Sequence, residues 1–135
     1  MAYENVNHIT YNLPLVDFGD GSSGAVDAMS FRLPTGYRGR LVKIGVAVTE
    51  TFACDTTAAC VKLGTSSDDD AYAKLNIADG TADLDFFDET DDTDAIIDKD
   101  IPADTLLKLT TAVGVDAATE AGMGHPMLVF EIYQR

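Results

Sequence analysis

The chain has 135 residues, and 46% of them are hydrophobic, which predicts one domain with a sizeable core. Its formal net charge of -14 at pH 7 opposes binding to nucleic acid or to anionic lipid, since that affinity comes from Lys and Arg. No apolar run reaches the ~18 residues of a membrane span, and Met1 to His8 lack the basic and apolar regions of a signal peptide. We therefore expect no nucleic-acid or membrane partner, and synthesis in the cytoplasm.

The N-terminal residues predict an arm that precedes an edge strand. Residues 1–10 place Tyr3, Val6 and Ile9 ahead of the sheet, either as an arm that contacts a neighbouring subunit or as a frayed terminus. His8 to Val16 then has the composition of a strand. Pro14 favours an edge position, because proline cannot donate to a ladder. The β domain itself is expected over residues 11–135.

Gly19 to Gly24 matches the pattern G-x-G-x-x-G of dinucleotide-binding loops. Such a loop needs a helix to follow it, because the helix N-terminus binds the pyrophosphate. Here Val26 to Leu33 alternates as a strand and Pro34 ends it. We therefore interpret the glycines as a flexible turn.

The strongest strand prediction follows Arg40. Its β-branched residues and two glycines disfavour a helix. Period-two alternation assigns these residues to two faces. One face would carry Val42, Ile44, Val46 and Val48, and the other Lys43, Gly45, Ala47 and Thr49.

Cys54 and Cys60 are the two cysteines of the chain and bracket a five-residue segment. A disulfide is geometrically possible if the flanking strands pair. Without a secretion signal, reduced thiols are the favoured state. Two cysteines with the distant His8 and His125 match no common zinc-finger spacing.

The middle of the chain predicts one short helix among strands. Ser67 to Asp70 fits a capping box, and a helical turn or two would continue to Lys74. Asp-, Gly- and Thr-rich turns separate the further strand candidates. These are Val61 to Gly64, Lys74 to Ile77, Leu84 to Phe87, Ala95 to Ile97 and Thr105 to Thr111.

The chain closes on an alternating run after a glycine-rich turn that ends at Gly124. Leu128, Phe130 and Ile132 would share one face, with Val129 and Tyr133 on the other. Both faces are therefore apolar, so this strand is either central in its sheet or covered by a neighbouring subunit.

Together these elements predict an all-β fold, a jelly roll or β-sandwich of about eight strands with at most one short helix. No serine or cysteine lies in a nucleophile elbow, and a pair of carboxylates is uninformative among 23 acidic residues. The sequence thus predicts no catalytic residue, no enzyme activity and no cofactor.

Charge is unevenly distributed along the chain. Fourteen carboxylates lie between Asp68 and Asp104 against two lysines. These acidic loops either keep the protein solvated or attract a basic partner surface. The basic residues of the first half cluster and could dock on an acidic partner or on the chain's own carboxylates. They are Arg32, Arg38, Arg40 and Lys43.

The acidic runs also raise the question of calcium, which prefers carboxylate and carbonyl oxygens. Asp83 with Asp85, and Asp98 with Asp100, have the spacing of two carboxylates on one strand face. No run contains the glycine and terminal glutamate of the helix-loop-helix calcium loop. We predict no dedicated metal site, while weak surface binding stays open.

Three segments resemble the small capsid decoration, or cement, proteins of tailed bacteriophages: Gly36 to Thr51, Val61 to Lys74, and the glycine-rich Ala121 to Gly124 before the last strand. The resemblance is one of pattern, over roughly Arg32 to Tyr133. It implies a homotrimer on the capsid exterior of the virion that binds the major capsid protein. For the closing strand, it favours contact with a neighbouring subunit over a central position in the sheet. A phage tail or head-fibre module that binds a receptor or glycan is the alternative.

The family carries no residue-level contact signature to transfer. From the residues themselves we select candidates for subunit or capsid contact by their apolar character ahead of the sheet, by their place in the basic cluster, or by their position on the closing strand. They are Tyr3, Val6, Ile9, Arg38, Arg40, Val129 and Tyr133.

Overall fold

The structure is a computed structural model that describes residues 7–19 and 26–134. Ten strands and no helix lie within these ranges. Two of the ten, β2 and β8, contain only two residues each. The strands are β1 (Asn7–Asn12), β2 (Val16–Asp17), β3 (Val26–Phe31), β4 (Tyr37–Ala53), β5 (Ala59–Gly64), β6 (Ala73–Ile77), β7 (Phe86–Asp88), β8 (Asp100–Ile101), β9 (Leu107–Ala112) and β10 (Ala121–Gln134).

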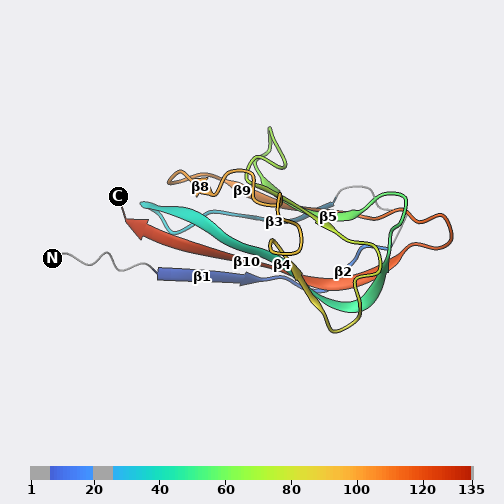
Figure 1. Cartoon of the computed structure of the whole chain (residues 1–135). Helices are drawn as coiled ribbons and strands as arrows, with labels where there is room; N and C mark the ends of the chain where they lie inside the picture. The colour runs from blue at the N-terminus through green and yellow to red at the C-terminus, as the bar shows by residue number, and fades with distance from the viewer. Residues whose placement is uncertain (1–6, 20–25, 135) are drawn as a thin grey trace.

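The strands form two antiparallel sheets that pack face to face (Figure 1). Sheet A has the order β1-β10-β4-β7, with β2 added to β10 and β8 to β4. Sheet B has the order β3-β9-β5-β6. Without β2 and β8, each sheet has four strands, and the strand orders β1-β10-β4-β7 and β3-β9-β5-β6 are those of a jelly roll. The predicted all-β sandwich is confirmed, with ten strands in place of about eight.

Long strands in the middle of sheet A hold the fold together. β10 lies between β1 and β4 and pairs with β4 from Ala121↔Ala53 to Gln134↔Tyr37. Of the two possibilities for the closing strand, the central position is therefore the observed one. β1 pairs with β10 alone and forms an edge, in keeping with Pro14 directly beyond it.

The core lies between the sheets and is built from alternate residues of the strands. β10 contributes Leu128 and Phe130, and both are fully buried. At one end of the core the rings of Tyr11 and Phe31 pack with centroids 4.6 Å apart, and Phe130 lies edge-on to Tyr11 at 5.8 Å. Such aromatic contacts add to the free energy gained by burial alone.

A β-bulge corrects the predicted faces of β4. Phe130 pairs with Leu41 and Val129 pairs with Lys43, so Val42 has no partner on β10. The extra residue shifts the alternation by one position. Leu41 consequently points into the core together with Ile44, while Val42 is only half-buried. The prediction that Val42 shares the buried face of Ile44 is wrong.

The predicted helix from Ser67 to Lys74 is absent, because strand pairing takes its place. The amide of Tyr72 donates to the carbonyl of Leu63 at 3.0 Å, and β6 begins at Ala73. A turn in which the amide of Thr65 donates to the carbonyl of Asp68 replaces the capping box. This turn folds back against Gly64, where a Cβ would lie 2.1 Å from the carbonyl oxygen of Asp68.

The segment from Asp92 to Ile97 covers the free edge of β6. The amide of Lys74 donates to the carbonyl of Ala95, and the amide of Ile97 donates to the carbonyl of Tyr72. Ala95 to Ile97 therefore forms an isolated bridge to Ala73 instead of the predicted strand. The outer hydrogen-bonding groups of β6 are in this way largely satisfied within the chain.

Within the described part of the chain, no helix has the length and apolar character to cross a membrane. The thiols of Cys54 and Cys60 are free, which is the state that the sequence favoured, and both are buried. Cys54 directly follows β4 and Cys60 lies on β5, and these two strands belong to different sheets and do not pair. Of the predicted glycine turn, residues 20–25 lie outside the described residues.

Candidate interaction surface

The side chains of β1, β10 and β4 that point away from the core form a continuous surface, the outer face of sheet A. Register determines its members, because residues paired across the strands point to the same side. Tyr133 pairs with Arg38, Glu131 with Arg40, and Val129 with Lys43. Next to them, β1 adds further polar side chains. These are His8, Thr10 and Asn12.

Four of the seven predicted contact residues thus lie on one surface. Arg38 and Arg40 are exposed, and Val129 and Tyr133 are half-buried between neighbouring strands. Tyr133 lies beside the guanidinium group of Arg38, and both aromatic residues and arginine are enriched at protein contact surfaces. The sequence analysis selected these residues for separate reasons, and the pairing of β4 with β10 brings them together.

The other three predicted residues do not join this surface. Ile9 lies on β1 opposite Phe130 and packs, half-buried, against the core. Since β1 begins at Asn7, residues 7–10 belong to sheet A and are not part of an arm. The assignment of Ile9 to an exposed arm is therefore corrected. Tyr3 and Val6 lie outside the described residues.

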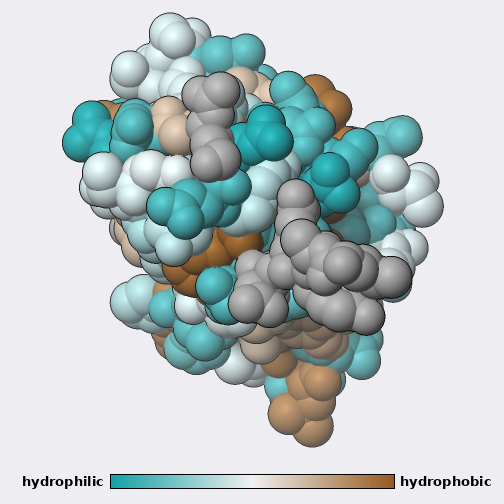
Figure 2. Space-filling model, turned by 90° about the vertical axis from the view of Figure 1, so that its left-hand side faces the viewer, coloured by the Kyte–Doolittle hydropathy of each residue, from teal (hydrophilic) through white to brown (hydrophobic). Residues whose placement is uncertain are grey.

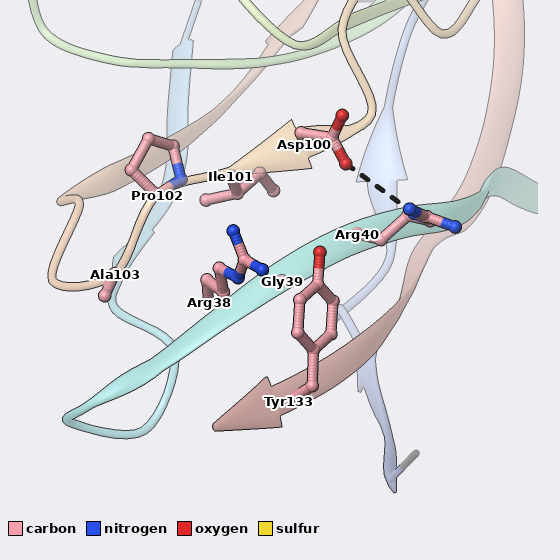
Figure 3. Close-up of a pocket in the computed structure, with 8 residues that line it drawn as sticks. All are labelled: Arg38, Gly39, Arg40, Asp100, Ile101, Pro102, Ala103 and Tyr133. Atoms are coloured by element: carbon pink, nitrogen blue, oxygen red, sulfur yellow. Dashed lines mark ion pairs between the residues drawn. The ribbon is translucent and has the colours of Figure 1, made fainter. Parts of the chain in front are cut away.

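Arg38 and Tyr133 form one wall of a pocket at the end of the outer face (Figure 3). The guanidinium carbon of Arg38 lies 4.8 Å from the centroid of the Tyr133 ring. This cation–π contact orients the guanidinium while leaving its donors free. We call this site the arginine pocket. Its volume is about 440 Å³, and it is lined by Arg38, Gly39, Arg40, Asp100, Ile101, Pro102, Ala103 and Tyr133.

The arginine pocket contains charged groups of both signs. Nε of Arg40 lies 3.6 Å from Oδ1 of Asp100, and both side chains are exposed, so this ion pair adds little stability. Arg38 forms no ion pair with any residue in 7–19 or 26–134. With two arginines and one aspartate, the pocket has one net positive charge. It can accept a single carboxylate through the planar fork of Arg38.

Lys43 anchors the middle of the outer face to β7. Its Nζ donates to Oδ2 of Asp88 at 2.7 Å and lies 3.8 Å from Glu89. The hydrogen bond to Asp88 is the main cause of a raised pKa for Lys43. Burial alone would raise the pKa of Asp88, but hydrogen bonds from Lys43 and Thr90 outweigh it and lower that pKa. Both groups therefore stay charged at neutral pH.

Many carboxylates serve as acceptors for loop backbone amides. Asp79 accepts from the amide of Cys54 at 2.9 Å, and Glu50 accepts from that of Gly122 at 3.0 Å. Asp55 and Asp116 hold two loops together, since each accepts an amide from the other loop. Such bonds lower the pKa of Asp116, mainly through the amide of Ala118. The acidic residues thus shape the loops as well as solvating them.

The one group of three acidic side chains in the described residues with oxygen atoms close enough to share a metal ion is Asp68, Asp69 and Asp70. Asp68 and Asp69 are exposed, and Asp69 is already paired with Nζ of Lys62 at 2.8 Å. Asp83, Asp85 and Asp98 lie outside strands, so the strand spacing proposed for them is wrong. The arrangement supports weak cation binding at most.

The sequence analysis missed an exposed apolar tip at residues 82–85. Leu84 is 90% exposed and has a φ of 71°, in the left-handed region. The tip is held firmly, because the amide of Leu84 donates to the carbonyl of Val48 and the amide of Val48 donates to the carbonyl of Asp85. Figure 1 shows this connection between β6 and β7, coloured yellow, projecting from the sandwich. The sequence analysis assigned Leu84 to the start of a strand, but β7 begins only at Phe86 and Leu84 lies in the turn before it.

Figure 2 views the end of the molecule where β10 terminates, and on this face the hydrophobic side chains form separate areas among hydrophilic ones. Among the residues described, the exposed large hydrophobic side chains come from separate loops and strands. They are Leu15, Leu84, Phe86, Ile97, Leu106 and Val115. The outer face of sheet A, the arginine pocket and the tip are therefore the features that distinguish this surface.

No family model and no curated protein matches the chain. Among solved structures, a chain of the cyanophage Pam1 capsid asymmetric unit is similar to it, with a TM-score of 0.54 and 15% sequence identity. The match covers 100% of this chain and 89% of that chain. At this identity the likeness shows a shared fold over the whole length, so the chain has the fold of that capsid component.

Proposed function

We propose that the chain is a non-enzymatic structural protein of a tailed-bacteriophage virion that decorates the capsid exterior as a homotrimer. Its partner would be the major capsid protein. The observation that carries this proposal is the full-length likeness to a chain of the Pam1 capsid asymmetric unit. The resemblance of three sequence segments to decoration proteins supports it independently.

The outer face of sheet A is the proposed contact surface. Arg38 and Arg40 supply charge, while Val129 and Tyr133 supply apolar area that water covers only in part. Binding there removes apolar surface from water, and opposite charges select the partner. The positions of the two histidines support a non-enzymatic role, because both side chains have structural contacts. Nε2 of His8 lies 3.6 Å from Oε1 of Glu131, and Nδ1 of His125 contacts the carbonyl of Leu13.

Cosedimentation with capsids that lack the protein tests the proposal. The wild-type chain should sediment with such capsids, and Val129→Glu should reduce its binding at least tenfold, because a carboxylate would be placed within the contact. Ser30→Glu is the matched control: Ser30 is exposed on β3, in the other sheet, and should bind like the wild type. Light scattering measures the expected trimer separately.

Two results would contradict the proposal. A wild-type chain that does not sediment with capsids has no decoration role. If the same protein is instead retained by a host glycan or receptor, the alternative of a tail or head-fibre module is supported.

A further inference from the structure

The tip at residues 82–85 has a fixed and strained backbone, and the side chain of Leu84 at its centre is exposed. A left-handed backbone conformation is sterically unfavourable for a residue such as leucine, because its Cβ comes too close to the following carbonyl oxygen. The 90% exposure of Leu84 leaves its whole side chain in water as well. Strain of this kind persists where the surrounding structure imposes it and is concentrated at functional sites. Here the backbone bonds to Val48 impose it.

The tip also carries two exposed carboxylates, Asp83 and Asp85, on either side of the leucine. Its chemistry is therefore apolar at the centre and negative at the flanks. A complementary site must offer an apolar wall next to cationic donors.

The arginine pocket has that composition. Arg38 extends between Tyr133 and Ile101, and Pro102 lies on the same side (Figure 3). Ile101, Pro102 and Ala103 form an apolar wall, and the guanidinium of Arg38 forms no ion pair within the described residues.

We propose that the tip of one copy docks in the arginine pocket of a second copy. Leu84 packs on the wall of Ile101 and Pro102, and an aspartate of the tip pairs with Arg38. The inference rests on the self-association in the proposed function and names the surfaces that would produce it.

The contact forms between copies because the two surfaces are held apart within one chain. The tip is bonded to Val48 and the pocket begins at Arg40, and both residues lie on β4. Eight strand residues separate them by roughly 26 Å at about 3.3 Å per residue. Two different surfaces that fit each other give a head-to-tail interface, which closes into a ring when the rotation between copies allows it.

Charge exchange tests the contact. Asp83→Arg combined with Asp85→Arg changes the tip, and Arg38→Asp changes the pocket. Each change should weaken self-association at least tenfold, measured by sedimentation velocity with light scattering. Combining them restores opposite charges across the interface and should recover most of the loss.

If net charge alone controlled self-association, the tip variant would associate more strongly than the wild type. Each Asp→Arg change adds two positive charges, so two changes move the net charge from -14 to -10 and reduce repulsion between copies. Stronger association of the tip variant would therefore overturn the proposal.

Leu84→Ser should also weaken association, whereas Leu15→Ser, at a leucine 50% exposed in another loop, should not.

Failure of this contact and failure of the proposed function have different signatures. Tip and pocket variants that associate like the wild type, or a combined variant that recovers nothing, overturn the contact. A wild-type chain that stays monomeric overturns it too. Cosedimentation of the wild type and of Val129→Glu with capsids then still decides the decoration role, because Val129 lies on the outer face of sheet A and does not line the arginine pocket.

Discussion

Gly45 lies directly beneath the aromatic ring of Phe86. A Cβ at residue 45 would come within 2.5 Å of Cζ of Phe86 and 3.0 Å of the carbonyl oxygen of Phe87. The glycine therefore lets β7 approach β4 closely enough for the ring to cover the strand, where Nζ of Lys43 lies 5.3 Å from the ring centroid.

Gly45→Ala should lower the free energy of unfolding by about 1–3 kcal/mol, because the ring must move and the backbone carbonyl cannot follow freely. Urea denaturation measures the change. Phe86→Ala provides the control, since removing the ring should reduce the cost of Gly45→Ala. An equal cost in both backgrounds would mean that the two residues are not coupled.

Asp88→Asn should destabilise the protein by about 1–3 kcal/mol at pH 7, because it removes the charged acceptor of Lys43 in a largely buried position. The pKa of Asp88 is lowered in the folded state, so its contribution is present above the ordinary value of 3.8 and is lost as the pH falls below it. The difference between wild type and variant should therefore shrink from about pH 5 downward.

Urea denaturation from pH 7 to pH 3 gives this comparison. Asp94→Asn is the control, since Asp94 is exposed and should show little effect at any pH. A constant difference for Asp88→Asn across the whole range would contradict the lowered pKa.

Alternation predicted the sheets well, because burial on one side repeats every second residue. It placed Leu128, Phe130 and Ile132 in the core correctly. It failed at Val42, because a bulge adds one residue that no local pattern reveals. Ile9 fell within both the predicted arm and the predicted strand from His8, and its alternation with Tyr11 favours the strand, in which both side chains pack against the core.

The helix and the contact surfaces were harder to predict for a different reason. Ser67 to Asp70 favours a helix locally, but pairing of β5 with β6 satisfies more backbone groups than one helical turn would. The arginine pocket joins Arg38, Asp100 and Tyr133, which are far apart in the sequence. Only the register of three strands brings them together.

Leu84→Gly should raise the free energy of unfolding by about 1 kcal/mol, since glycine adopts the left-handed conformation without steric cost. Thermal or urea denaturation of dilute protein measures the change. Asp104 also has a left-handed backbone, with a φ of 61°. Asp104→Gly should raise the free energy of unfolding by less, because aspartate tolerates this conformation better than leucine does. A loss of stability in Leu84→Gly would show that the side chain has a contact within the chain.

Cys54 and Cys60 should react slowly with a thiol reagent at pH 8 in the folded protein. Burial raises the pKa of both thiols, so little thiolate is present, and the reagent has no access. Unfolding in urea should accelerate labelling at least roughly tenfold. A reductant should leave the melting temperature unchanged, and a marked fall would indicate a disulfide.

The segment from Asp92 to Ile97 limits what can happen at high protein concentration. A sheet that grows into a cross-β fibril must offer an open edge on each side, because every added strand has to leave a new template behind it. Sheet B offers β3 at one side. At the other side the amides of Lys74 and Asn76 on β6 already donate to the carbonyl of Ala95 and the carboxylate of Asp92. Pairing between copies through this sheet therefore stops at two molecules, so dense packing of the protein need not lead to polymerisation.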